Sequence, residues 1–228
     1  VNVVNGDFYV DTTDLELLGQ FPLAIRRNYT SSNVADNGLG FGWRLGFATY
    51  LQFKAYNGDP QGIIMAAEMD GSVIAYSRPI SSSTQWTVDI ALNPMLKNAT
   101  DKGIGSTANL YQNYITSNGT DYTLYAVNGE VRSYKTQSFP IDDMAVRSRP
   151  YLDSWYDANG NGFTFSYYQS KTDFGYGNLE RIDSVNGNFL LFKYNSKRLV
   201  SNILTKDGRE VTYSYNTHRD LTQVTLPD

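Results

Sequence analysis

A 21-residue period in the last third of the sequence constrains the fold of this chain more than any other feature. Three stretches carry it, GNGFTFSY from Gly160, GNFLLFKY from Gly187 and GREVTYSY from Gly208. In each stretch the third, fifth and seventh residues after the glycine are apolar, and such alternation predicts a strand with one buried face. These inward positions hold Phe163, Phe165, Tyr167, Leu190, Phe192, Tyr194, Val211, Tyr213 and Tyr215.

A second strand in each unit repeats with the same spacing. Its apolar residues form two rows at intervals of 21: Leu179, Val200 and Leu221, and Ile182, Ile203 and Val224. The pairs Asn186-Gly187 and Asp207-Gly208 supply the positive φ that tight hairpin turns require. Each unit is therefore predicted to be a strand, a turn, a strand and a turn.

The first unit is longer than the other two. Gly160 precedes Gly187 by 27 residues, and the six additional residues fall between Gln169 and Gly177. This insertion predicts a longer hairpin loop at that place.

The composition agrees with a fold made of strands and turns. The 228 residues include 18 Tyr, 11 Phe and 19 Gly, and hydrophobic residues make up 41% against 18% charged. Aromatic residues favour pleated, half-buried surfaces and glycine favours turns. One hairpin is marginally stable alone, whereas neighbouring hairpins bury a continuous apolar face. We therefore predict an all-β fold of successive antiparallel hairpins, forming a strongly twisted or curled sheet that is part of an open β-shell.

Charge and composition also exclude several partners. The net charge is −4 and the basic residues are scattered, which disfavours nucleic acid. No apolar run approaches the length of a membrane span. The absence of cysteine removes thiol chemistry and disulfides together. The chain opens at Val1 and stops at Asp228 inside a repeating pattern, so we expect a piece of a longer polypeptide.

The upstream part of the sequence has hairpin signals without a regular period. Asn57-Gly58, Asn118-Gly119 and Asn128-Gly129 lie between apolar runs. The stretch from Ser138 to Pro150 has the composition of a connection. We predict an N-terminal β region over residues 1–150 and about three repeat hairpins over residues 151–228, the last unit being incomplete.

The repeat resembles the YD repeat of RHS proteins. The last unit carries the matching elements Gly208-Arg209, Tyr213-Ser214-Tyr215 and Leu221-Thr222-Gln223-Val224, with Tyr215-Asn216 in place of the signature Tyr-Asp. The first 50 residues resemble the segment that commonly precedes such repeats. Its motifs occur in the expected order: Asn5-Gly6-Asp7-Phe8, Thr13-Asp14-Leu15, Pro22-Leu23, Arg27-Asn28-Tyr29 and Gly42-Trp43.

The resemblance implies a structural role. RHS proteins build long hairpin arrays that spiral into a hollow shell, and bacterial members enclose a C-terminal toxin. On this basis we expect a secreted or cell-surface protein whose partner is the remainder of the same polypeptide, including a C-terminal effector. The chain would contribute the start of the shell.

Residues suited to catalysis are few. His218, the chain's one histidine, falls at a predicted hairpin tip, where a solvated turn residue is the simplest interpretation. No G-x-S-x-G motif marks a nucleophile. Asp142 and Asp143 are adjacent, and neighbours in an extended chain point apart. We expect no enzymatic activity and no cofactor.

Residues 157–162 match the first half of a calcium loop. Asp157, Asn159 and Asn161 occupy ligand positions 1, 3 and 5, and Gly162 occupies position 6. Position 12 is Tyr168 rather than the bidentate glutamate that such a loop needs. Because Asn-Gly pairs also form hairpin turns, a turn is the preferred interpretation.

The aromatic residues allow an alternative function, a carbohydrate-binding or adhesive module. Exposed rings stack on sugar faces, and the candidates are Trp43, Trp86 and Trp155. The competing interpretation places the aromatic residues in the packed face of the sheet, as the alternation of the tyrosine rows suggests.

Overall fold

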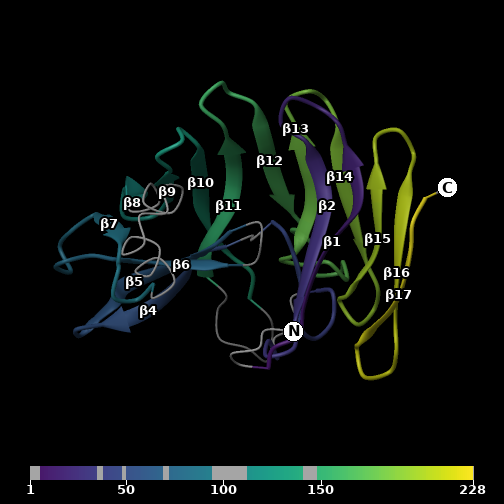
Figure 1. Ribbon diagram of the computed structural model, residues 1–228, viewed down its shortest axis with the longest axis horizontal. Coiled ribbons are helices and arrows are strands. Elements are labelled where there is room, and N and C mark those ends of the chain that lie inside the picture. Colours follow the sequence, from purple (N-terminus) through teal and green to yellow (C-terminus); the bar gives the residue numbers. More distant parts are fainter. Residues whose placement is uncertain are drawn as a thin grey trace. The chain divides into compact units, whose positions relative to one another are not determined.

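The computed structural model describes residues 6–34, 38–47, 50–68, 72–93, 112–140 and 148–227. These residues form antiparallel β-strands joined by turns, and none of them lies in an α-helix. Strands β1 to β3 make a small sheet, and strands β4 to β17 follow one another in chain order in a larger, open sheet (Figure 1). The prediction of an all-β fold built from successive hairpins is confirmed.

The strands are β1 (Tyr9–Leu17), β2 (Leu23–Thr30), β3 (Trp43–Leu45), β4 (Gln52–Tyr56), β5 (Asp59–Ala67), β6 (Val73–Ser77), β7 (Gln85–Val88), β8 (Tyr114–Ser117), β9 (Tyr122–Tyr125), β10 (Val131–Ser138), β11 (Ser148–Tyr156), β12 (Gly162–Tyr167), β13 (Leu179–Ser184), β14 (Phe189–Tyr194), β15 (Val200–Thr205), β16 (Glu210–Tyr215) and β17 (Leu221–Thr225).

The chain groups into two compact units. The first comprises Val1–Ala48, Met69–Gly71 and Phe163–Asp228, and the second comprises Thr49–Glu68 and Ser72–Gly162. The first unit thus joins the N-terminal segment to the repeat hairpins. The division of the sequence at residue 150 stays a prediction.

One five-residue turn recurs through both units. The amide of its first residue donates to the carbonyl of its fifth at 2.8–3.0 Å, and the amide of its fourth donates to the carbonyl of its first at 2.8–3.2 Å. The fourth residue has a positive φ, between 63° and 85°. The described residues hold six such turns, with Gly129, Gly160, Gly187, Arg198, Gly208 and Arg219 at the fourth position.

The repeat hairpins pack as the period predicts. Phe163, Leu190 and Val211, at equivalent inward positions, are at most 1% exposed, and so are Ile182 and Ile203 on the returning strands. The last strand, β17, is less covered, with Leu221 and Val224 half-buried. The longer loop predicted between Gln169 and Gly177 is also confirmed, since the amide of Gly177 donates to the carbonyl of Tyr168 at 2.9 Å.

The repeat tyrosines also make equivalent hydrogen bonds. The hydroxyl of Tyr194 donates to the carbonyl of Leu179, and that of Tyr215 donates to the carbonyl of Val200, both at 2.8 Å. Each carbonyl lies 15 residues before its tyrosine, next to an irregularity in strand pairing. The hydroxyl therefore satisfies a backbone acceptor within each repeat, which phenylalanine would leave unpaired.

Within the first unit, the small sheet packs against the repeat strands (Figure 1). The ring of Phe21 stacks on that of Phe163 with centroids 4.9 Å apart, and Phe47 meets Phe163 and Phe165 edge-on. Leu23 and Ile25 of β2 are fully buried. The inward face of the first repeat thus shares a core with residues more than 100 positions earlier in the chain.

Candidate functional site

Trp86, one of the three tryptophans proposed to bind sugars, lies in the core of the second unit. Its side chain is 1% exposed. The indole nitrogen donates to the carbonyl of Gln61 at 2.8 Å, and the Arg78 guanidinium lies over the ring at 4.6 Å. The ring therefore has no face available to a ligand, and it packs β7 against β5 and against Arg78, the residue after β6.

Trp155, the second candidate, has similar surroundings. It is 4% exposed, its indole nitrogen donates to the Glu130 carboxylate at 3.2 Å, and Arg132 lies over its ring at 3.8 Å. Arg132 is itself buried and pairs with Glu68 at 2.6 Å. This cluster of charges and rings is structural, and it leaves Trp43 as the remaining candidate for binding.

Trp43 differs from the other two tryptophans because it lines a surface pocket. The side chain is half-buried in the first unit, with Arg27 over the ring at 4.3 Å and the Tyr29 ring 5.2 Å away. Within the described residues its indole nitrogen makes no hydrogen bond to the protein. An aromatic ring with an unused polar edge is typical of residues that contact ligands.

A glycine-rich loop of residues 38–42, named the glycine loop here, brings Trp43 to the pocket. Its three glycines alternate with Leu39, which is fully buried, and Phe41, which is 44% exposed. The carbonyl of Gly38 accepts a hydrogen bond from the Val200 amide at 2.7 Å, which anchors the loop to β15. The alternation therefore fixes one apolar residue inward and presents the next outward.

The glycines of this loop are required by backbone geometry and close packing. Gly38, Gly40 and Gly42 all have positive φ, at 93°, 84° and 78°. A Cβ on Gly40 would overlap the carbonyl oxygen of Arg219, and one on Gly42 would overlap the ring of Tyr29. Only glycine allows the loop to adopt this path against the hairpin tip between β16 and β17.

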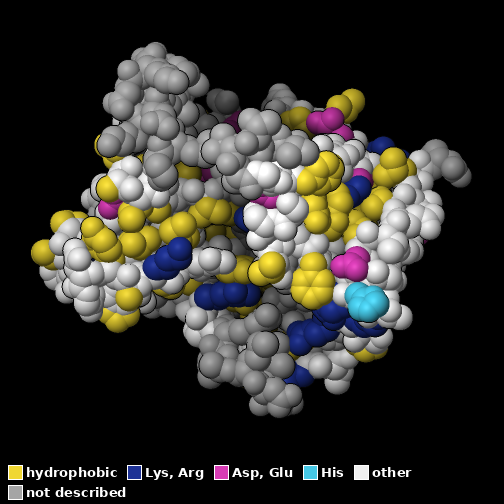
Figure 2. Space-filling model, turned by 60° about the horizontal axis from the view of Figure 1, so that its bottom comes forward, with side chains coloured by type: hydrophobic (Ala, Val, Ile, Leu, Met, Phe, Trp, Pro, Cys, Tyr) yellow, Lys and Arg dark blue, Asp and Glu magenta, His cyan; other side chains and the backbone are white. Residues whose placement is uncertain are grey.

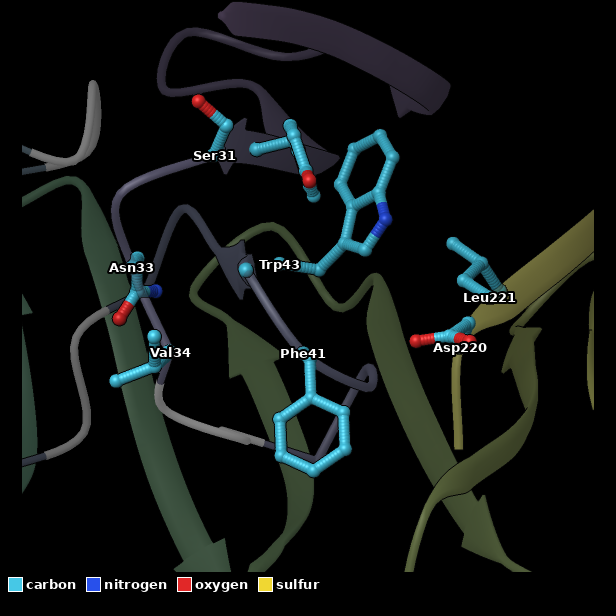
Figure 3. Close-up of a pocket in the computed structure, with 9 residues that line it drawn as sticks. Ser31, Asn33, Val34, Phe41, Trp43, Asp220 and Leu221 are labelled. Carbon is cyan, nitrogen blue, oxygen red and sulfur yellow. The ribbon is translucent and has the colours of Figure 1, made fainter. Parts of the chain in front are cut away.

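The pocket has a volume of about 470 Å³ and mixes aromatic with polar groups. Figure 3 shows Trp43 at its centre and Phe41 beside it, with Ser31, Asn33 and Val34 on one side and Asp220 and Leu221 on the other. The glycine loop, the end of β2 and the last hairpin thus each contribute to its lining.

The polar groups of the pocket differ in how many hydrogen bonds they already make within the protein. The Ser31 hydroxyl donates to Asp7 at 2.6 Å and accepts from the Phe8 amide at 2.9 Å. Hydrogen bonds from the hydroxyls of Ser31 and Ser32 lower the pKa of Asp7. Asp220, by contrast, is exposed and one of its oxygens accepts from Asn216 at 2.8 Å. Its second oxygen has no hydrogen-bond partner among the described residues, and Figure 3 shows an Asp220 oxygen directed toward the aromatic residues of the pocket.

A buried polar network contacts Trp43 through Arg27, whose guanidinium lies over the indole ring. The Asp14 carboxylate accepts from the Arg27 guanidinium at 2.7 Å and from the Tyr213 hydroxyl at 2.8 Å. Burial first, and the negative charge of Asp14 second, raise the pKa of Tyr213. In the sequence, Asp14 and Arg27 occur in motifs that carry only a family resemblance, and the alternation of the repeat predicts Tyr213 as an apolar core residue. No sequence signal showed that these three residues meet.

The residues considered for calcium binding form one of the recurrent turns. The Asp157 carboxylate accepts from the amides of Asn159 and Asn161 at 2.8 and 2.9 Å, and from the Asn161 side chain at 2.9 Å. These hydrogen bonds lower the pKa of Asp157. Asn195 and Asn216 begin their turns with the same side-chain bonds to the second and fourth following amides. The matching half-motif is thus accounted for by turn chemistry.

Of the candidates for catalysis, the structure describes His218. His218 lies in the turn between β16 and β17, where the sequence placed it, and the histidine is on the surface in Figure 2. Asp142 and Asp143 lie outside the described residues. Among the residues that the structure does describe, no group of three His, Cys, Asp or Glu side chains is arranged to hold a metal ion. The same residues contain no helix that could cross a membrane.

The fold resembles that of a bacterial effector domain. Solved structures similar to the chain include the N-terminal domain of effector protein SpvB from Salmonella typhimurium strain LT2, with a TM-score of 0.51 and 12% sequence identity over 91% of this chain and 95% of that one. At this identity the similarity shows the fold alone.

The N-terminal third of the sequence matches a known family model. Residues 1–76 match a family model described as Domain of unknown function (DUF6531). That match covers β1 to β5 and the glycine loop, and it includes most of the residues that line the Trp43 pocket. No curated protein matches the sequence.

Proposed function

We propose that this chain is a structural segment of an RHS-type, YD-repeat shell in a secreted or cell-surface protein. The shell would enclose or present a C-terminal effector in the same polypeptide, and the chain would have no catalytic role of its own. The observation that carries the proposal is the repeated hairpin of β13 to β16, in which each strand has six residues and each adds an equivalent apolar row.

The repeat geometry supports extension by further hairpins. Turns of one type join the strands, so each added unit continues the same sheet with the same buried face. Strand β17 pairs with β16 along one edge and leaves Leu221 and Val224 half-covered. An apolar row of this kind gains burial when a neighbouring strand is added.

The attachment of the N-terminal segment to the repeats also supports a scaffold. The Tyr213–Asp14 hydrogen bond links residues 199 positions apart, and its partners are almost fully buried. The small sheet therefore covers the repeat strands of its unit as a fixed element. The likeness to an effector protein's N-terminal domain is compatible with such a scaffold upstream of an effector.

The test is protease protection in the longer polypeptide that contains this chain. If the scaffold encloses an effector, a C-terminal segment that is cut rapidly when produced alone will resist the same protease when joined to the hairpin array. Cryo-electron microscopy of the same protein should show strands continuing from β17. A C-terminal segment that is cut equally fast in both forms, beside a β17 edge covered by an unrelated domain, would contradict the proposal.

A further inference from the structure

The three tryptophans provide an internal comparison that sets Trp43 apart from Trp86 and Trp155. Each has an arginine guanidinium over its ring, at 3.8–4.6 Å. Trp86 and Trp155 are buried and their indole nitrogens donate to protein oxygens, as a core tryptophan requires. Trp43 keeps the arginine and yet is half-buried, with an indole nitrogen that has no protein partner in the described residues.

The direction of that nitrogen is informative. In Figure 3 the indole nitrogen of Trp43 lies on the side of Asp220 and Leu221, and a carboxylate oxygen of Asp220 points toward the aromatic residues. A donor and an acceptor therefore flank the same pocket, beside the exposed ring of Phe41. A ligand with both apolar C–H surface and hydroxyl groups would use all of these features.

Charge narrows the class of ligand. Among the described residues, no lysine or arginine lines the pocket, and Asp220 contributes a negative charge at its edge. Phosphate, sulfate and carboxylate groups would meet this carboxylate without a compensating cation. A shallow site with a ring for stacking and a carboxylate that accepts hydroxyl protons suits an uncharged ligand that carries several hydroxyl groups.

We propose that the Trp43 pocket binds a neutral oligosaccharide. One sugar ring would rest its C–H face on Phe41 and Trp43, while its hydroxyls donate to Asp220 and accept from the Trp43 indole nitrogen. The proposal does not rest on the proposed shell, because the lining of the pocket belongs to one compact unit of this chain, although Asp220 and Leu221 come from its last repeat hairpin.

The test uses the three indole N–H resonances of the 228-residue chain in nitrogen-15 NMR spectra. Maltotriose, cellotriose and chitotriose are titrated separately into the millimolar range. At least one of them should shift the Trp43 resonance saturably while the resonances of the buried Trp86 and Trp155 stay in place. A Trp43 resonance that no trisaccharide moves would overturn the proposal.

Two variants distinguish the pocket from other exposed aromatic surface. Phe41→Ala removes a ring that is 44% exposed and should weaken binding about tenfold, the effect of losing one aromatic contact. Phe174→Ala is the matched control, since this ring is 56% exposed in the same unit and does not line the pocket. Equal dissociation constants for Phe41→Ala and the unmodified chain would overturn the proposal, as would tighter binding of a sulfated heparin tetrasaccharide.

Discussion

The repeat hairpins β12 to β17 and the hairpins β4 to β11 share one turn type, which joins four pairs of repeat strands and also β9 to β10, yet only the repeat hairpins produce a period in the sequence. Strands β12 to β16 have six residues each, so equivalent positions return at a fixed interval. Strands β5, β7, β10 and β11 have nine, four, eight and nine residues. The difference shows that the architecture depends on turn chemistry and one buried face, whereas the period reflects equal strand length.

The two regions also stabilise their interiors differently. The second unit uses buried arginines over tryptophan rings, with carboxylates as partners. The repeat strands use aliphatic and aromatic rows with tyrosine hydroxyls that donate to carbonyls. Buried charge without its partner is costly, and a lost hydroxyl is much less so. Substitutions should therefore have larger effects in the irregular region.

The largest effect is expected from Arg132→Met in the second unit. The change keeps most of the side-chain volume and leaves Glu68 and Glu130 without their cation. Breaking a buried ion pair leaves uncompensated charge and typically lowers the free energy of unfolding by about 3–5 kcal/mol. We expect the lower end, about 3 kcal/mol, because the two carboxylates are 22% and 21% exposed and keep some contact with water. Urea denaturation followed by tryptophan fluorescence measures this change.

Lys135→Met, on the same strand, is the control for Arg132→Met. Lys135 pairs with Asp153 at 2.9 Å but is 60% exposed, so its loss should cost about 0–1 kcal/mol. Equal destabilisation by the two variants would show that the buried Arg132 cluster contributes no more to stability than an exposed ion pair of the same strand.

Tyr213→Phe tests the buried link between the small sheet and the repeats. The Asp14 carboxylate loses one donor and keeps Arg27, so we expect a loss of about 1.5–3 kcal/mol at pH 8. A change under about 0.5 kcal/mol would show that the hydroxyl contributes only local packing.

The same variant has an expected pH dependence. Because the pKa of Tyr213 is raised above 10.0 in the folded chain, the unfolded chain loses this proton first as the pH rises. The stability from the neutral hydroxyl is fully present below pH 10.0 and is lost progressively above it. The stability difference between the unmodified chain and Tyr213→Phe should therefore narrow from pH 8 to about pH 11, and a constant difference would contradict the link.

Tyr194→Phe tests the hydrogen bond that recurs with the repeat. The carbonyl of Leu179 would lose its donor, which should lower stability by about 0.5–1.5 kcal/mol. Tyr114→Phe is the control, since this ring stacks on Tyr125 in the irregular region and has no repeat-related carbonyl partner. Denaturation midpoints of the two variants give the comparison. A larger loss of stability for Tyr114→Phe would show that the hydrogen bond of the repeat tyrosine is no special source of stability.

The smallest effect concerns the turn at residues 157–161. Because the Asp157 carboxylate already accepts three hydrogen bonds, calorimetric titration with calcium in the millimolar range should give no heat of binding. Saturable heat that Asp157→Asn abolishes would show instead that this turn differs in function from the other five.

The sequence by itself determined the strands, the turns and the buried rows of the repeat region. Alternation and turn residues are local, so positions such as Leu190 and Ile203 could be assigned to the core from spacing alone. The positive φ of Arg198 and Arg219 could not be predicted from the sequence, because arginine is not a residue type that indicates a left-handed backbone conformation. The folded hairpins show that the side chains of Asn195 and Asn216, each at the first position of its turn, accept hydrogen bonds from backbone amides of the same turn.

The tertiary structure alone decided which aromatic residues are accessible and which polar residues meet. Trp43, Trp86 and Trp155 have no local pattern that separates them, and their exposure depends on strands far away in the sequence. The contact between Asp14 and Tyr213 spans most of the chain and follows from packing the small sheet on the repeats. Local periodicity fixes which face of a strand is buried, whereas long-range packing fixes what that face is buried against.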